Sequence, residues 1–364
     1  MIFTSESVTE GHPDKVADLI SDAILDVHME QDPFARVACE TLVKGGNVVL
    51  AGEITSAGQV DYDRVVRETI RSIGYTDPAN VFNADSVRIT SLLTQQAPEI
   101  AAGVIHATDD PTQQGAGDQG MMFGFACDDT PELMPLPIFL AHRLAERLAQ
   151  DRHSGRVAWL RPDGKTQVTV EYQAMRPVRV LTVLVSAHHG DVSQQTVRDY
   201  VREQLVPSVL KSWWRDDIEI IVNPSGSFRE GGPNVDCGLT GRKIIVDTYG
   251  GFARHGGGAF SGKDPTKVDR SGAYFCRYVA RRIVSSGIAR CAEVRVAYAI
   301  GRARPIGIDV ETFGTGDAER AIELVRSFDF RPGEIIRQLR LRQPIYRRTT
   351  NYGHFGKPSL PWET

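Results

Sequence analysis

Residues 13–30 read PDKVADLISDAILDVHME and residues 35–54 read ARVACETLVKGGNVVLAGEI, and together they indicate the unit from which the fold is built. In the first stretch, apolar side chains recur at helical spacing until Asp32-Pro33 ends the run, which predicts a helix. In the second, apolar runs at 35–43 and 48–54 are joined by Lys44-Gly45-Gly46-Asn47, which predicts a hairpin. A further helix is expected over 60–73, because Gly74 follows its end.

The same order of elements returns twice along the chain. The second copy has a helix at 132–150, paired strands at 167–172 and 178–187, and a helix at 192–210. The third has a helix at 268–285, strands at 292–300 and 306–311, and a helix at 317–328. The copies share negligible sequence identity, so what repeats is the architecture. We predict a mixed α/β (α+β) fold of three similar sheet-plus-helix domains.

Composition narrows the class of protein. The 364 residues are 41% hydrophobic and 24% charged, which is typical of a globular protein with more than one core. A net charge of −4 gives no footprint for nucleic acid, and nothing resembles a signal or a membrane span. We therefore predict a cytoplasmic protein with no nucleic-acid or membrane partner. Its five cysteines lack C-x-x-C spacing and are expected to be buried thiols: Cys39, Cys127, Cys237, Cys276 and Cys291.

The segment 256–270, GGGAFSGKDPTKVDR, has the chemistry of a polyphosphate site. Its glycines let backbone N–H groups approach phosphate oxygens, and the helix predicted from 268 adds a positive dipole. Its two lysines neutralise charge and its two aspartates can hold Mg²⁺. Two more cationic positions lie upstream, at Lys243 and at His12 with Lys15.

Two familiar nucleotide motifs match only in letters. Gly115-x-Gly117-x-x-Gly120 follows a polar turn and precedes a strand-like stretch, whereas a dinucleotide-binding turn needs a strand before it and a helix after it. The stretch 257–263 imitates a P-loop, but Asp264 stands where a Ser or Thr should hold Mg²⁺. We therefore reject both motifs.

The carboxylates near these sites also have simpler interpretations. Asp14 taken alone is expected to cap a helix. The four-residue spacing of Asp14, Asp18, Asp22 and Asp26 is typical of a solvated helix face. Glu40 and Glu53, taken singly, are expected to be satisfied carboxylates at strand ends.

Taken together, the motifs resemble the S-adenosylmethionine synthetase family over nearly the full chain. The matching blocks are FTSESVTEGHPDK at 3–15, GAGDQG at 115–120, GLTGRKIIVDTYGG at 238–251, the segment 256–270, YGHFG at 352–356 and PWE at 361–363. The resemblance implies three domains with pseudo-threefold symmetry. Their expected bounds are 1–100, 115–229 and 230–364, with a mobile active-site loop at 101–114.

The resemblance also implies the reaction. The methionine sulfur attacks C5′ of ATP, the whole triphosphate departs, and it is then cleaved to pyrophosphate and phosphate. A thioether sulfur is already nucleophilic, whereas the leaving group needs several cations, and the residues above suit that need. Two alternatives stay open: another ATP-dependent phosphotransferase or nucleotide hydrolase using the same cationic site, and a nucleotide-binding scaffold without catalysis.

By motif, the resemblance assigns site residues in this chain. The catalytic group is His12, Asp118, Lys165, Arg242, Lys243, Lys263 and Lys267. Contacts to ATP come from His12, Asp163, Lys165, Ser227, Phe228, Asp236, Arg242, Lys243, Ala259 and Lys263. Methionine is bound by Glu53, Gln96, Asp236 and Lys267.

Metals and partners follow from the same resemblance. Two Mg²⁺ per site are expected, with Asp14 and Asp269 as ligands, and K⁺ at Glu40. Family members form homodimers with shared active sites, commonly paired into tetramers, so that His12 and Lys165 act from the neighbouring subunit. The chain departs from the family pattern at Ser227, where a basic residue is usual, and Arg229 is a candidate replacement.

Overall fold

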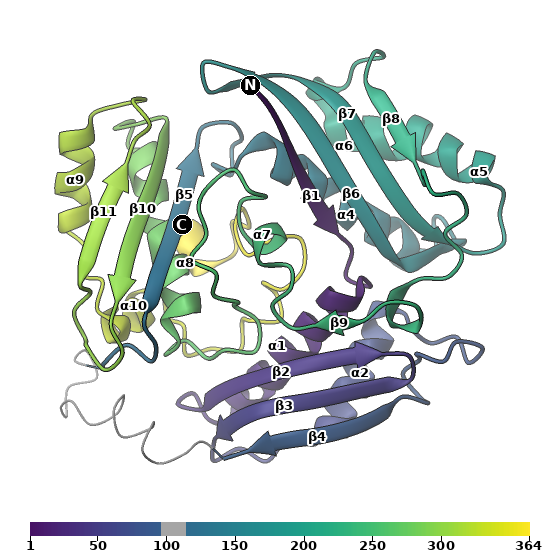
Figure 1. Ribbon diagram of the computed structural model, residues 1–364, viewed down its shortest axis with the longest axis horizontal. Coiled ribbons are helices and arrows are strands. Elements are labelled where there is room, and N and C mark those ends of the chain that lie inside the picture. The colour runs from purple at the N-terminus through teal and green to yellow at the C-terminus, as the bar shows by residue number, and fades with distance from the viewer. Residues whose placement is uncertain (96–113) are drawn as a thin grey trace.

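A computed structural model describes residues 1–95 and 114–364 of the chain. It confirms the predicted mixed α/β fold: three sheets stand around a common centre, and helices cover one face of each (Figure 1). The active-site loop expected at 101–114 lies outside the described residues, apart from Gln114.

The first sheet has the strand order β4-β3-β2-β9. Its strands are β2 (Arg36–Lys44), β3 (Asn47–Thr55), β4 (Arg88–Thr94) and the short β9 (Gly238–Leu239). The predicted hairpin is β2 with β3, and β4 joins β3 in parallel. Helix α1 (Pro13–Gln31) packs on β2 and on α2 (Tyr62–Ile73), as the apolar spacing of both stretches predicts.

The second sheet has the order β1-β6-β7-β8 and is covered by α4 (Leu136–His153). Its strands are β1 (Ile2–Val8), β6 (Leu160–Gln173), β7 (Arg176–His189) and β8 (Glu219–Val222). The helix predicted at 192–210 is divided into α5 (Gln194–Asp199), a π-helical turn (Tyr200–Leu205) and α6 (Val206–Leu210). Pro207 explains the division, because it lacks an N–H and its ring excludes the carbonyl four residues earlier.

The third sheet has the antiparallel order β11-β10-β5, built from β5 (Gly120–Cys127), β10 (Cys291–Tyr298) and β11 (Gly307–Glu311). Helix α8 (Val268–Ser285) packs on β5 and β10, α9 (Ala318–Arg326) packs on β11, and α10 (Pro332–Gln338) contacts α8. A single turn, α7 (Ile244–Asp247), lies near the centre (Figure 1). Short 3₁₀ turns occur at Lys211–Trp213, Gly232–Asn234 and Pro361–Glu363.

Each sheet contains one strand from a distant part of the chain. The N-terminal strand β1 pairs with β6 of the second sheet, and β9 pairs with β2 of the first. Strand β5 pairs with β10 of the third sheet. Two of the exchanged strands bring the segments 9–15 and 238–243 into contact, since the N–H of Leu239 donates to Asp14. The domain bounds given above stay a prediction.

In the view of Figure 1, α1 and α2 lie behind the first sheet, α4 behind the second and α8 behind the third, so the sheet faces toward the viewer are not covered by these helices. Side chains on β2 and β7 alternate between buried and more exposed positions. Large apolar residues are exposed in each sheet, including Leu92 at 59%, Val178 at 44% and Ile308 at 42%. Within residues 1–95 and 114–364, no helix is both long and apolar enough to cross a membrane.

Candidate active site

Helix α1 begins where the polar segment 9–15 enters the molecule. His12 is the N-cap: its ring Nδ1 accepts the N–H of Asp14 at 3.1 Å, and Pro13 opens the first turn. Because Nδ1 is the acceptor, a neutral His12 carries its proton on Nε2. The Tyr75 hydroxyl donates to the carbonyl of Gly11 at 2.5 Å, which holds the residue before the cap.

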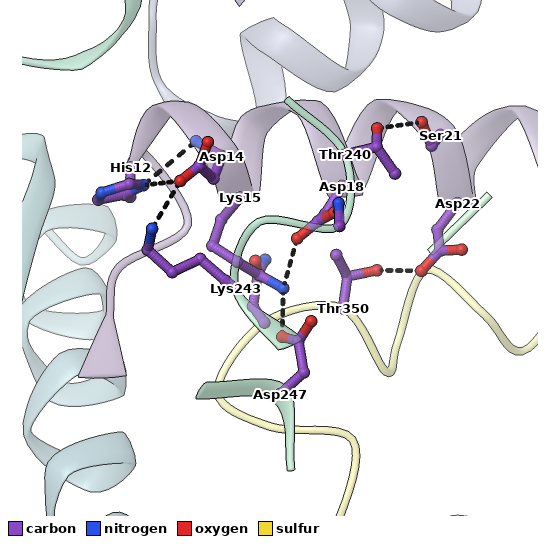
Figure 2. A network of polar contacts seen from close by, with 12 residues as sticks. His12, Asp14, Lys15, Asp18, Ser21, Asp22, Thr240, Lys243, Asp247 and Thr350 are labelled. Atoms are coloured by element: carbon purple, nitrogen blue, oxygen red, sulfur yellow. Dashed lines mark hydrogen bonds and ion pairs between the residues drawn. The ribbon is translucent and has the colours of Figure 1, made fainter. Parts of the chain in front are cut away.

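The interpretation of the acidic row on α1 as a solvated helix face is wrong, because all four carboxylates are buried. Figure 2 shows three of them reaching toward other parts of the chain. Each accepts backbone N–H groups from another segment: Asp14 from Leu239 (3.1 Å), Asp18 from Gly241 (2.8 Å), Asp22 from Gly262 (2.9 Å), and Asp26 from Tyr346 (2.9 Å) and Arg347 (2.8 Å). One carboxylate per turn therefore positions three segments against a single helix.

Lys15 lies inside the protein between two carboxylates (Figure 2). Its Nζ donates to Asp18 at 3.0 Å and to Asp247 at 2.6 Å. Burial alone would lower the pKa of Lys15, but the two carboxylates raise it above its ordinary value. Burial raises the pKa of Asp247 to about 7, against the effect of the Lys15 charge. Lys15, which the sequence placed with His12 as a cationic candidate, therefore supports the segment 241–247 from within.

The first group of expected site residues surrounds the start of α1. Lys243 Nζ is 2.6 Å from Asp14 Oδ2, and Arg242 Nε is 3.5 Å from Asp14 Oδ1. Burial acts to raise the pKa of Asp14, but the bond from Lys243 holds it below its ordinary value. Burial lowers the pKa of His12 to about 3, and the Lys243 charge acts in the same direction. Lys165, on β6, and Asp236 also act on the His12 ring electrostatically.

The remaining residues assigned to ATP near the first group lie on two other segments of the chain, at 163 and at 227–228. Asp163 accepts the N–H of Gly232 at 2.8 Å, and burial raises the pKa of Asp163 to about 6. Phe228 stacks on His188 with ring centroids 5.2 Å apart. Ser227 is exposed, and the neighbouring Arg229 forms an ion pair of 2.7 Å with Asp191 at the surface. Arg229 is therefore engaged away from the Asp14 cluster.

The second group lies on the glycine-rich segment 256–270. Lys263 Nζ is 2.6 Å from Asp269 Oδ2, and Lys267 Nζ is 2.5 Å from Asp264 Oδ2. A side chain at Gly258 would meet Asp269, because its Cβ would lie 2.1 Å from the carboxylate oxygen. Helix α8 begins only at Val268, five residues after Lys263, which supports the rejection of a P-loop.

The side chain of Asp22 connects the glycine-rich segment to helix α1. Both of its oxygens are used: Arg270 donates through Nη1 at 2.7 Å and Nη2 at 3.0 Å, and Thr350 donates at 2.8 Å. Asp22 and Arg270 are both fully buried. No sequence motif assigned Asp18, Asp22 or Arg270 a role in the site. The four-residue spacing of the two aspartates from Asp14 places them on one face of α1, but it does not show that this face is buried.

The other predicted site residues occupy different positions. Ala259 packs close to Gly241, since a Cβ on that glycine would lie 2.6 Å from the Ala259 methyl group. Asp118 is exposed, one residue after Gly117, whose backbone abuts Thr266. Glu40 and Glu53 are exposed on β2 and β3, so their carboxylates face solvent and not the interior of the chain. Gln96 lies outside the described residues.

One chain therefore presents two groups of charged residues, one at Asp14 and one next to Gly262, the glycine bonded to Asp22. Eight residues of α1 separate Asp14 from Asp22, a distance of roughly 12 Å along the helix axis. Among the described residues, no three His, Cys, Asp or Glu side chains converge in a way that could hold a metal ion. Each group instead offers a single expected metal ligand, Asp14 or Asp269, bonded to a lysine.

Comparisons with known proteins identify the family over nearly the whole chain. The family models for the N-terminal, central and C-terminal domains of S-adenosylmethionine synthetase match residues 1–98, 113–228 and 230–364. An S-adenosylmethionine synthase of Sorangium cellulosum is 56% identical over 99% of this chain and 87% of its own length. Those of Desulforudis audaxviator and Thermus thermophilus are 55% and 54% identical, each over the whole chain and 95% of the relative.

Proposed function

This chain belongs to the S-adenosylmethionine synthetase family, and from that premise we propose how its two groups of charged residues act on the substrates. It is a methionine adenosyltransferase, which forms S-adenosylmethionine from ATP and L-methionine. The phosphotransferase or hydrolase alternative is not favoured, because the likeness extends over all three domains. The observation that supports the proposal for the site is the row of lysine–aspartate pairs beside glycine-rich backbone.

The lysines are expected to act on the triphosphate. The sulfur of methionine is neutral and needs no base to attack C5′, so the barrier depends mainly on how well the departing triphosphate is stabilised. Lys243 and Arg242 at the first group, and Lys263 and Lys267 at the second, supply fixed positive charge for that purpose. His12 adds a neutral donor, because its Nδ1 is already bonded to Asp14 and its Nε2–H is available.

The lysine and the aspartate of each pair can exchange their mutual contact for contacts to the substrate and its metal. Lys243 and Lys263 are 17% and 23% exposed at the side chain, so both are within reach of a ligand. When a triphosphate with its metal binds, we expect Asp14 and Asp269 to turn to the metal and the two lysines to the phosphate oxygens. The lysines are held in place beforehand, which reduces the reorganisation that the transition state requires.

The donor set suits Mg²⁺ carried in with the substrate. Mg²⁺ commonly uses one or two carboxylates together with substrate phosphates and water, and each group of this chain offers one carboxylate, Asp14 or Asp269. Bound Mg²⁺ would neutralise charge on the leaving group. The family is generally metal-dependent, and we propose two Mg²⁺ per site and K⁺ at the exposed Glu40. Glu53, Asp236 and Gln96 are proposed to bind methionine, and Asp163, Phe228 and Ala259 to bind the adenosine.

The distribution of the two groups favours a homodimer with shared sites. The face of the first sheet that carries Glu40 and Glu53 also exposes the apolar side chain of Leu92, and such a surface is suited to meeting a partner. Glu40 and Glu53 lie on the exposed face of the first sheet, so a second copy there would bring them into a site. We propose that His12 and Lys165 of one subunit act with Lys263 and Asp269 of the other, and that dimers pair into tetramers.

The activity is tested by incubating the protein with ATP, L-methionine, MgCl₂ and KCl and detecting the sulfonium product by mass spectrometry. Asp14→Asn and Lys263→Ala are each expected to lower turnover about 10²–10³-fold, the cost of losing one main charge contact in the transition state. Arg64→Ala, which removes an exposed cation on α2, is the matched control and should leave turnover unchanged. Near-normal turnover in either site variant would contradict the assignment of the site.

The shared site has its own test. His12→Ala and Lys263→Ala subunits are co-expressed, so that mixed dimers form. If each site takes one group from each subunit, half of the dimers contain one intact site, and about a quarter of the wild-type activity returns. If both groups act within one chain, the mixture stays as inactive as either variant alone.

Removal of the metal is a separate test. EDTA should abolish activity, and Mg²⁺ should restore it.

A further inference from the structure

Two of the five cysteines lie directly opposite each other in the third sheet. Cys127 is the last residue of β5 and Cys291 is the first of β10, and the strand register pairs them. Both are free and buried, with 0% and 1% of their surfaces exposed. The other three have no cysteine opposite them: Cys39 faces Gly52 on β3, Cys276 lies on α8, and Cys237 lies in a loop.

The backbone hydrogen bonds identify the type of pair. Cys127 N–H donates to Leu133 O at 3.3 Å, and Cys291 N–H donates to Thr315 Oγ1 at 3.0 Å, so the two residues exchange no backbone bond. They form a non-hydrogen-bonded antiparallel pair, in which Cα atoms are about 4.5 Å apart. Disulfides span Cα separations of about 4.4 to 6.8 Å. The pair therefore meets the distance requirement for a disulfide without any shift of the strands.

The two thiols also differ in character. Burial raises the pKa of Cys127 well above its ordinary value, while a hydrogen bond from Cys127 lowers the pKa of Cys291. Cys291 is therefore the better nucleophile of the two and Cys127 the group that remains a thiol. Above the pair, Arg290 Nε forms an ion pair of 3.1 Å with Asp128, and both side chains are partly exposed.

We propose that Cys127 and Cys291 are a modification site at which a peroxide forms a reversible cross-strand disulfide. The Cys291 thiolate attacks one peroxide oxygen, the O–O bond breaks, and a proton completes water, which leaves a sulfenic acid on Cys291. The Cys127 sulfur then attacks the Cys291 sulfur, and its proton leaves with the hydroxyl as a second water. In total, two thiols and one hydrogen peroxide give one disulfide and two waters.

The position of the pair determines how the reaction proceeds. Both cysteines lie at strand ends, where fraying is easier than in the middle of a sheet. The oxidant reaches them when the strand ends open beneath Arg290 and Asp128. The half-buried Cys237 should therefore react sooner. The bond joins positions far apart in the sequence, so it should raise the melting temperature of the oxidised protein.

The test uses the full-length wild-type protein in its folded state. It is treated with graded hydrogen peroxide, free thiols are alkylated in denaturant, and the protein is digested without reductant and analysed by mass spectrometry. We expect a linked peptide pair containing Cys127 and Cys291 that dithiothreitol separates, and Cys39 and Cys276 recovered as alkylated thiols. Recovery of Cys127 and Cys291 as alkylated thiols, at peroxide doses that have oxidised Cys237, would overturn the proposal.

Two variants distinguish this disulfide from unspecific oxidation. Cys127→Ser should abolish the linked pair and leave Cys291 to be oxidised to a sulfinic acid, because no resolving thiol remains. Cys276→Ser is the matched control, a buried cysteine in the neighbouring helix, and should leave the linked pair unchanged. Formation of the linked pair only after denaturation would also overturn the proposal.

Discussion

Asp22 is the residue whose removal should most clearly reveal how the glycine-rich segment is supported. Its two oxygens accept four hydrogen bonds, from the N–H of Gly262, from both terminal nitrogens of Arg270 and from Thr350. In Asp22→Asn the side chain keeps its shape, but the amide presents a nitrogen to groups that are all donors. Arg270 is fully buried and would lose its carboxylate partner.

The size of the effect follows from that burial. Removing one member of a buried ion pair destabilises a protein by about 3–5 kcal/mol, because the remaining charge is left uncompensated. Unfolding entropy is about 2.1 cal/mol/K per residue, which gives about 0.76 kcal/mol/K over 364 residues. The quotient predicts that the melting temperature falls by about 4 to 7 °C. A larger fall would follow if only part of the chain unfolded in the transition.

The assay is differential scanning calorimetry or fluorimetry on the purified protein, with turnover measured well below the transition. Asp85→Asn is the matched control, because Asp85 pairs with Arg71 at the surface, with side chains 75% and 48% exposed. An exposed pair contributes about 0–1 kcal/mol, so this variant should melt within about 1 °C of the wild type. Equal melting temperatures for the two variants would refute the view that Asp22 holds Arg270 and the glycine-rich segment together.

Two further predictions concern backbone space and pH. Gly262→Ala should destabilise the protein by more than the roughly 1–2 kcal/mol of left-handed strain, because φ is +79° and the new Cβ would lie 2.0 Å from the Cys39 carbonyl oxygen. The matched control is Gly287→Ala, where φ is +73° and nothing lies within 4 Å; equal denaturant midpoints would contradict the clash. Burial raises the pKa of Asp26 to about 7, above its value in the unfolded chain. Between these two pKa values the folded protein keeps a proton on Asp26 that the unfolded chain releases. The stability that this proton contributes is therefore lost as the pH rises toward 7. The melting temperature of the wild type minus that of Asp26→Asn should therefore increase as pH is lowered from 7 to 5, and a constant difference would count against the shift.

Local patterns predicted the main helices and the paired strands of each unit, because these depend on residues close in sequence, whereas β1, β4, β8 and α10 were not predicted. The spacing of apolar residues located α1, and the Gly45-Gly46 turn located the hairpin of β2 and β3. The pairing of β1, β5 and β9 with distant strands was not predictable in this way, since a short apolar strand carries no information about which sheet edge it joins. The division of the 192–210 helix was not predicted either. To predict it, one would have to recognise that Pro207 changes the hydrogen-bond register of the preceding turn.

The site was predicted in part, for a related reason. Motif likeness located Asp14, Lys243, Lys263 and Asp269, and these do form two lysine–aspartate pairs. A row of carboxylates with four-residue spacing is the same whether it faces water or other parts of the chain. Whether the row faces water or the rest of the chain depends on the path of segments 239–241, 262 and 346–347. That path is set by contacts across the whole molecule.

The row of buried carboxylates on α1 explains why so many charged side chains lie next to the candidate site inside the protein. Asp18 and Asp22 hold backbone N–H groups at Gly241 and Gly262, and each glycine lies within two residues of a lysine expected to meet the triphosphate. Because both carboxylates project from one helix, each lysine-bearing segment is held in a fixed position on that helix, whichever site of the proposed dimer it serves. Charges placed this way need not move far when a polyanion arrives, which is the condition under which electrostatic stabilisation of a leaving group is most effective.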